Sequence, residues 1–132
     1  MALTNAREVS DAAAAVVAAF ARHDSLAYFA TFAPEATFIF HNHEHVLRSR
    51  VEYENLWRSW ELDGFRVAEC ASHDGSVQML TDDVGIFTHS VRTTLVGNTD
   101  ASATKERETI VFQRIGNVWL GVHEHLSLEP TP

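Results

Sequence analysis

Residues 114–127, "RIGNVWLGVHEHLS", predict the end of one β-strand, a tight turn and a second β-strand. The pair Gly116-Asn117 separates two runs rich in apolar side chains, which is typical of a hairpin. A strict two-residue turn would place Val111 beside Val122. A bulged turn, with the Asn in the left-handed region, would place Ile110 there instead. We favour the bulged turn because it gathers the larger apolar side chains on one face of the sheet.

The second of these strands, 118–128, separates into two faces by alternation. One face carries Leu120, Val122, Glu124 and Leu126, and the other carries Trp119, Gly121, His123, His125 and Ser127. The bulged register also sets Phe112 beside Leu120 and Glu108 beside Glu124. Since the apolar set should face the core, the pattern directs Glu124 into the interior and both histidines away from it.

Working outward from this hairpin, periodicity and turn residues predict the other elements. The expected helices cover 5–22, 24–32 and 49–63, and the expected strands cover 36–42, 65–80, 84–96, 105–115 and 118–128. Pro34 ends the second helix, because proline disfavours helical geometry in the residue before it. The order α-α-β-α-β-β-β-β is typical of an α+β domain with its helices on one face of a strongly curved antiparallel sheet.

Capping-box spacing marks the starts of two helices. Asn5 with Glu8 precedes the first apolar stripe, although Thr4 is an equal candidate for its cap. Ser49 with Glu52 opens the third helix. These signals place the helix starts more firmly than propensity alone would.

The chain has 132 residues and one cysteine, Cys70, so one hydrophobic core is expected and an intramolecular disulfide is excluded. The formal net charge is −8 without any run of Lys or Arg, which argues against nucleic acid or a membrane as partner. Glu8 and Asp11 precede the N-terminal apolar run and no basic region does, so export is not predicted. We expect one cytoplasmic domain over 1–132, with its core at about 5–128.

This order of elements, ending in "RIGNVWLGVHEHLS", resembles the nuclear transport factor 2-like fold, and within it the SnoaL-like and ketosteroid-isomerase-like domains. A relative, the calcium/calmodulin-dependent protein kinase II association domain, ends in a similar strand with a Trp, then Val-His-Phe-His, then a Ser. The matching positions here are Trp119, "VHEH" at 122–125 and Ser127, and "YENLW" at 53–57 is also similar. The resemblance covers about residues 7–128.

The resemblance implies a cystatin-like cone, in which a bent sheet wrapped around the helices leaves a cavity open at one end. The association domain lines its cavity with arginines, whereas the aligned positions here are Val91, Ile110 and Leu126, so an anionic ligand is not implied. Ketosteroid isomerases use a cavity aspartate as base and a Tyr/Asp pair as oxyanion hole. No matching residues align here, and steroid isomerisation is not predicted.

Glu124 is the main candidate for chemistry, because a glutamate on a strand face shared with Val122 and Leu126 needs a partner or a cavity. Desolvation would raise its pKa toward the range useful for acid–base catalysis, while a charged His89 would oppose that shift. In the functional interpretation, Glu124 moves a proton on a small organic ligand and His89 donates to a carbonyl. In the structural interpretation, the two form a hydrogen bond, or the carboxylate meets water at the strand end.

An apolar cavity is expected to hold the ligand. The candidate ligand-binding residues are Tyr28, Phe38, Phe40, Asn42, Tyr53, Trp57, Trp60, Phe87, Val91, Glu108, Ile110, Phe112, Val122 and Leu126. Most of the aromatic ones also fit plain core packing, and Cys70 fits an inert buried thiol. The predicted function is thus binding of a small organic molecule, with cofactor-free isomerase, lyase or hydrolase chemistry by Glu124 and His89. The alternative is a non-catalytic ligand-binding or oligomerisation module.

His123 and His125 have the spacing of two metal ligands on one strand, and "HNHEH" at 41–45 adds further histidines. No third ligand is set by spacing and no Cys joins them, so a metal site is not predicted. The competing interpretation places both histidines, with Trp119, on the outer sheet face against a second subunit. The resemblance implies a homodimer that packs through this face, as members of the family commonly do.

Overall fold

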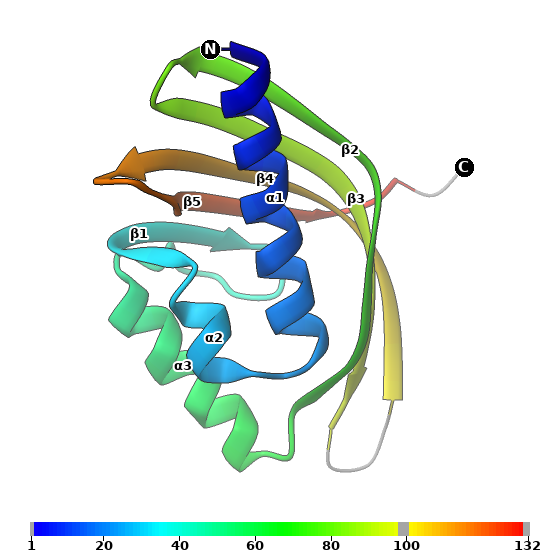
Figure 1. Cartoon of the computed structure of the whole chain (residues 1–132). Helices are drawn as coiled ribbons and strands as arrows, with labels where there is room; N and C mark the ends of the chain where they lie inside the picture. Colours follow the sequence, from blue (N-terminus) through cyan, green and yellow to red (C-terminus); the bar gives the residue numbers. More distant parts are fainter. Residues whose placement is uncertain (1, 98–100, 131–132) are drawn as a thin grey trace.

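Three helices and five strands make up the part of the chain that the computed structural model describes, residues 2–97 and 101–130 (Figure 1). The helices are α1 (Ala2–Ala21), α2 (Ser25–Phe29) and α3 (Arg50–Leu62). The strands are β1 (Phe32–Phe40), β2 (Arg66–Thr81), β3 (Val84–Val96), β4 (Ala101–Ile115) and β5 (Val118–Leu128). This order confirms the predicted α+β fold, and β3 and β5 have the bounds expected from the sequence.

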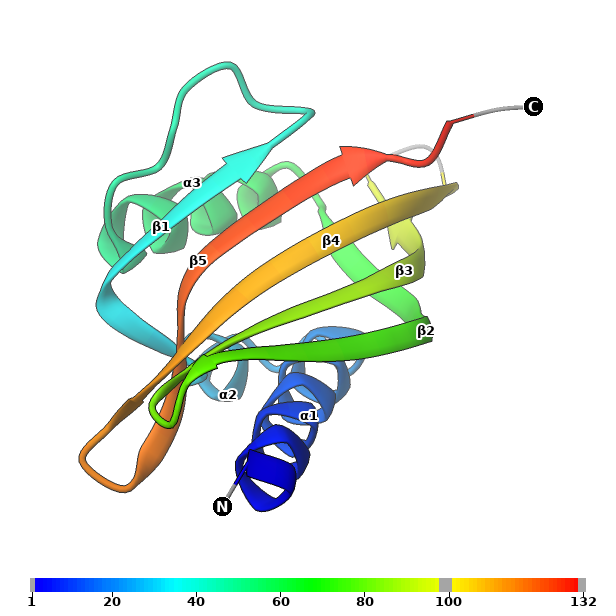
Figure 2. The ribbon, with the colours of Figure 1, turned by 90° about the horizontal axis from the view of Figure 1, so that it is seen from above.

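The strands lie side by side in the order β1-β5-β4-β3-β2. The antiparallel prediction is right for β2 to β5 but wrong for β1, which pairs with β5 in parallel. Figure 1 shows β2 and β3 bending around α1, and Figure 2 shows the strands fanned from β1 to β2. α1 packs on β2 and α3 packs on β1, so the helices lie inside the curve of the sheet.

The helix caps follow the sequence signals in two cases and depart from them in one. Ser49 accepts a hydrogen bond from the backbone N–H of Glu52 (3.2 Å), as its capping box predicts. Asp24 caps α2 by accepting from the N–H of Ala27 (3.1 Å). Asn5 does not cap α1, which begins at Ala2. Its amide instead donates to the backbone carbonyl of Asp82 (3.1 Å), so the first predicted cap is wrong.

Strand β1 begins at Phe32, four residues before the predicted start, and contains Pro34. Helix α2 correspondingly ends at Phe29. The strand lies at the edge of the sheet, where a residue without an N–H breaks no ladder. Pro34 therefore lies within an edge strand and does not mark the end of a helix.

The hairpin between β4 and β5 differs from the favoured register. Ile115 pairs with Val118, so Gly116-Asn117 is a strict two-residue turn, and the predicted bulged turn is wrong. An irregularity then lies at Val122, after which Ile110 pairs with Glu124. The predicted pairs of Phe112 with Leu120, Ile110 with Val122, and Glu108 with Glu124 are replaced by Phe112 with Gly121, Ile110 with Glu124, and Glu108 with Leu126.

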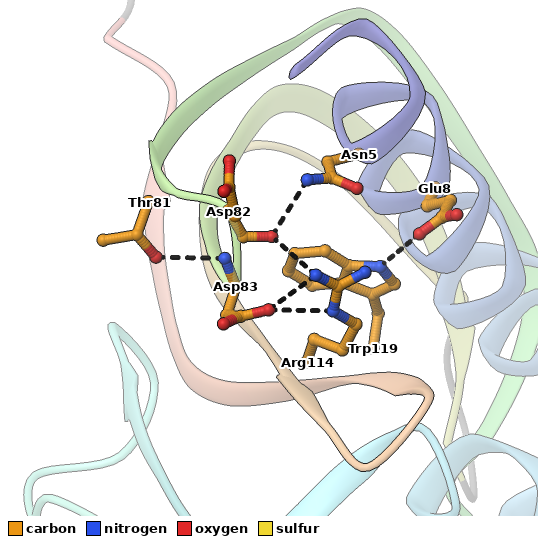
Figure 3. A network of polar contacts seen from close by, with 7 residues as sticks. All are labelled: Asn5, Glu8, Thr81, Asp82, Asp83, Arg114 and Trp119. Atoms are coloured by element: carbon orange, nitrogen blue, oxygen red, sulfur yellow. Dashed lines mark hydrogen bonds and ion pairs between the residues drawn. The ribbon is translucent and has the colours of Figure 1, made fainter. Parts of the chain in front are cut away.

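This irregularity exchanges the two faces of β5 at Val122 and corrects the placement of Trp119. The Trp119 side chain turns toward α1, where its indole N–H donates to Oε1 of Glu8 (2.9 Å) (Figure 3). Arg114 lies over the same ring at 5.5 Å and pairs with Asp83 (Figure 3). Trp119 is therefore not part of the outer sheet face, whereas Glu124 keeps its predicted inward direction because it follows the irregularity.

The core lies between the helices and the concave side of the sheet. Val9, Ala13 and Val16 of α1 are buried, as the apolar stripe of this helix requires. Tyr53 and Trp57 of α3 pack edge-on against the aromatic rings of α2 and β1. Within the described residues, no helix is both long enough and apolar enough to cross a membrane.

Candidate functional site

A cavity of about 390 Å³ lies between the helices and the sheet, within the usual size range of ligand pockets. Helices α1, α2 and α3 and all of the strands contribute to its lining. Nine predicted site residues line it: Tyr28, Phe40, Asn42, Tyr53, Trp60, Val91, Glu108, Glu124 and Leu126. The exposed residues Asp63, Gly97 and Ser102 also line it, so the cavity opens to solvent beside the ends of α3 and β3.

The other predicted site residues do not line this cavity. Phe38, Trp57, Phe87, Ile110 and Phe112 are buried in the core, where other side chains occupy the space around their rings and methyl groups. Val122 lies at the irregularity of β5 and is half-buried outside the lining. His89 is also absent from the lining, although it is buried and contacts a residue that belongs to it.

Glu108 and Glu124 form a carboxyl pair at the inner side of the cavity. Glu124 is 3% exposed, and the side chains of the two residues share a hydrogen bond. Burial, followed by the charge of Glu108 and this hydrogen bond, raises the pKa of Glu124 well above its usual value. Burial and the neighbouring Glu108 charge thus favour the protonated form of Glu124. Apart from the Glu108 carboxyl, its buried Oε1 atom has no hydrogen-bond partner in the described residues.

The carboxylate of Glu108 is stabilised by His89, its paired residue on the neighbouring strand β3. Burial alone would raise its pKa, but the hydrogen bonds from Glu124 and His89 and the charge of His89 together lower it. His89 Nε2 lies 2.7 Å from Oε1 of Glu108, and its Nδ1 lies 2.6 Å from the hydroxyl of Ser72. Ser72 is exposed on β2, so a chain of three contacts links the cavity acid to solvent.

This arrangement corrects the predicted role of His89. The predicted Glu–His hydrogen bond exists, but Glu108 makes it in place of Glu124. Both ring nitrogens of His89 already have partners, Ser72 and Glu108, so neither is free to donate to a ligand carbonyl. It positions Glu108 and favours its charged form.

Sequence reasoning missed a third acid, Glu106. Its Oε2 lies 2.5 Å from Nε2 of His41, and its Oε1 accepts from the Thr104 hydroxyl at 3.1 Å. Glu106 is 7% exposed and lines the cavity. The signal was its spacing, because residues two apart on a strand share a face and Glu106 precedes Glu108 by two.

Two tyrosines oppose these acids across the cavity lining. The hydroxyls of Tyr28 and Tyr53 lie 2.9 Å apart and both are buried. Burial, followed by the charge of Glu124, raises the pKa of each phenol well above its usual value. Both hydroxyls therefore stay protonated, and because one donates to the other, the pair has one hydroxyl proton left to donate. Cys70 also lines the cavity, and burial raises the pKa of its thiol to about 11, which makes it a poor nucleophile.

The histidines of β5 lie on the side of the strand opposite Glu124. His123 Nδ1 and the Thr37 hydroxyl oxygen lie 2.8 Å apart and share a hydrogen bond, and His125 is exposed. Burial, followed by the charge of His125, lowers the pKa of His123. Within residues 2–97 and 101–130, no group of three or more His, Cys, Asp or Glu side chains is arranged to hold a metal ion.

Known proteins with this fold differ widely in sequence. A ketosteroid isomerase-like protein from Erwinia carotovora atroseptica matches with a TM-score of 0.82 and 15% identity, over 96% of this chain and 97% of that one. The calcium/calmodulin-dependent protein kinase II hub from S. rosetta matches with a TM-score of 0.75 and 22% identity, over 94% and 96% of the two chains. A nuclear transport factor 2-like protein of unknown function in nutrient uptake, from Rhodospirillum rubrum, matches with a TM-score of 0.79 and 18% identity, over 92% and 98%.

These likenesses show the fold and leave the chemistry of the cavity to its own residues. No curated protein matches the sequence. The family model of the SnoaL-like domain matches residues 9–131, which is nearly the whole chain. The chain therefore belongs to the SnoaL-like domain family.

Proposed function

We propose that this protein binds a small, mainly apolar organic molecule in its conical cavity and moves a proton on it with the Glu108–Glu124 pair. The single observation that supports this proposal is a buried carboxyl pair, with oppositely shifted pKa values, on the wall of a solvent-connected cavity. Acid–base catalysis needs one group that holds a proton and another that accepts one at the same pH.

The two carboxyls have distinct roles in this mechanism. Protonated Glu124 donates its proton to an oxygen of the ligand, and the Glu108 carboxylate accepts a proton from a carbon of the ligand. Because the Glu108 charge disfavours an ionised Glu124, the proton collected by Glu108 then passes to Glu124 and restores the starting state. Tyr28 and Tyr53 place a second donor on the opposite wall, where a developing oxyanion would be stabilised. His89 holds Glu108 in position and connects the pair to solvent through Ser72. No step in this scheme requires a cofactor.

The test begins with a ligand found on the purified protein by native mass spectrometry. Wild type and Glu124→Gln are then incubated with that ligand in D₂O, and product formation and deuterium incorporation are followed by NMR. The amide keeps a donor toward Glu108 but has no proton to transfer. We expect turnover to fall by about 100-fold or more, while ligand binding persists.

Glu35→Gln is the matched control, because Glu35 is exposed on β1 and does not line the cavity. This variant should turn over the ligand at the wild-type rate. A Glu124→Gln protein with full activity would contradict the acid–base role, and so would a wild-type protein that binds the ligand without changing it.

A non-catalytic oligomerisation module is the second candidate function, and the likeness to a kinase hub favours it. In this form, copies of the chain pack through the outer sheet face around His123 and His125, in the homodimer expected from the sequence. Analytical ultracentrifugation distinguishes a monomer, a dimer and a larger ring. Substitution of His125 by Glu should shift the dimer toward monomer if this face is the interface, and an unchanged sedimentation coefficient would exclude it.

A further inference from the structure

We propose that the cavity selects a protonated amine carried on an apolar, ring-containing body. This inference rests on the proposed ligand-binding function of the same cavity, and names the chemical class of the ligand. It follows from the charges that line the cavity, from an unpartnered acceptor in its wall, and from the aromatic rings around it.

The inner wall of the cavity carries acids from two neighbouring strands. Glu106 and Glu108 follow each other on one face of β4, and Glu124 joins them from β5. Asp63 adds a fourth carboxyl at the exposed end. Among the described residues that line the cavity, none is a Lys, Arg or His, so a bound anion would meet no positive charge.

Two histidines bear on this charge from outside the lining. His41 contacts Glu106 and His89 contacts Glu108, and each compensates one carboxylate when it is protonated. Burial and the Glu108 charge raise the pKa of Glu124 and so favour its neutral, protonated form. Glu106 and Glu108 line the cavity whereas His41 and His89 do not, so a ligand meets the two carboxyl groups directly. A buried pair of this kind attracts a cation strongly, since little water screens it.

An unpartnered atom shows where an ammonium group would bind. Oε1 of Glu124 is buried and, apart from the Glu108 carboxyl, meets no hydrogen-bond partner in the described residues. A buried acceptor without a donor is costly, and an N–H of a protonated amine would satisfy it. A carboxylate group cannot, because it offers no donor at neutral pH.

Aromatic rings complete the site for a cation. Phe20, Phe40, Trp60 and Phe65 line the cavity together with the two tyrosines. Their faces attract a positive charge, and their edges and the neighbouring valine and leucine side chains enclose an apolar body. The lining thus combines negative charge with an aromatic, uncharged remainder.

The experiment uses three probes that share a phenyl ring: 2-phenylethylammonium, 2-phenylethanol and phenylacetate. Their dissociation constants are measured by isothermal titration calorimetry at pH 8, with wild type, Glu106→Gln, Glu108→Gln and the exposed control Glu35→Gln. We expect the ammonium probe to bind about 10-fold or more tightly than the alcohol, and phenylacetate to show no binding. Each cavity variant should raise the dissociation constant of the ammonium probe about 10-fold and leave that of the alcohol unchanged.

Equal binding of the ammonium and alcohol probes, absence of ammonium binding to the folded wild type, or ammonium binding that survives both cavity variants would overturn the proposal. Should Glu108→Gln fail to fold, Glu106→Gln alone decides, because its side chain is held only by His41 and Thr104 among the described residues. The calorimetric experiment measures binding and not turnover. A preference for the ammonium probe would therefore stand even if Glu124→Gln proved fully active. Conversely, proton transfer on a neutral ligand would leave the proposed function intact while this inference falls.

Discussion

Replacement of Glu124 by Gln should make the protein more stable, and the gain should grow with pH. Glu124 is 3% exposed, and burial and the Glu108 charge raise its pKa far above the value of about 4.3 that a Glu has in an unfolded chain. Gln has the shape of the protonated acid and keeps a donor toward Glu108. The substitution therefore removes the titration while preserving the contact.

The direction and size of the effect follow from proton linkage. Below about pH 4.3, both the folded and the unfolded wild type hold the proton, and the two proteins differ by a constant free energy of unfolding. As pH rises above this value, the unfolded state releases the proton while the folded state keeps it. Wild-type stability then falls by up to about 1.4 kcal/mol per pH unit until the pH passes the raised pKa of the folded state.

Urea unfolding at half-unit steps from pH 4 to pH 9 measures this difference. The free energy of unfolding of Glu124→Gln minus that of wild type should rise with the slope of one proton and then level off. The lowered pKa of Glu108 acts at the acid end, because its contribution to stability is lost as pH falls below about 4.3, in both proteins. In a Glu108→Gln background the rise should end at a lower pH, since one of the two main causes of the shift is gone.

Glu35→Gln provides the baseline, because Glu35 is exposed on β1 and lies outside the cavity, and its difference should be flat. A flat difference for Glu124→Gln between pH 5 and pH 8 would refute the reasoning. It would mean that Glu124 ionises normally inside the fold, and the proposed acid would then lack its proton at neutral pH.

Four further substitutions test the tyrosine pair of the cavity and the backbone of the β4–β5 hairpin. Tyr53→Phe leaves the buried Tyr28 hydroxyl without a partner and should cost about 1–3 kcal/mol of unfolding free energy. In a urea double-mutant cycle, the double variant Tyr28→Phe/Tyr53→Phe should cost less than the sum of the two single variants. Full additivity would show that the two hydroxyls do not depend on each other. Gly121→Ala places a Cβ 2.7 Å from the Phe32 ring and should cost about 1–3 kcal/mol. Gly116→Ala, at φ +64° with open space, should cost only about 1 kcal/mol of backbone strain, and equal melting temperatures would contradict this ranking.

The order of elements and the inward direction of Glu124 were predictable because both depend on repeating patterns. Strand alternation, the Ser49 capping box and the apolar stripe of α1 each involve several residues that agree. The register at Gly116-Asn117 was not predictable in the same way. With or without a one-residue irregularity at Val122, each face of β5 carries a reasonable set of side chains. The position of the irregularity therefore depends on the pairing with β4 and not on the sequence of β5 alone.

The candidate site was predicted in part for the same reason. Alternation placed Glu124 and Glu108 on the inner face, and the structure brings them together in one cavity wall. It could not assign hydrogen-bond partners, so His89 was placed in the cavity although Ser72 and Glu108 engage both of its ring nitrogens. The role of Glu106 depends on a contact with His41 across 65 residues of chain, which no local pattern reveals.

The parallel pairing of β1 with β5 has a consequence for how the protein is made. Thr37 and His123 are paired although 86 positions separate them, and β5 also fills the gap between β1 and β4. Until Val118–Leu128 have left the ribosome and docked, the nascent chain presents two open strand edges beside a half-lined apolar hollow. The chain is most exposed to aggregation during that interval, and the Glu108–Glu124 pair is complete only when β5 has docked.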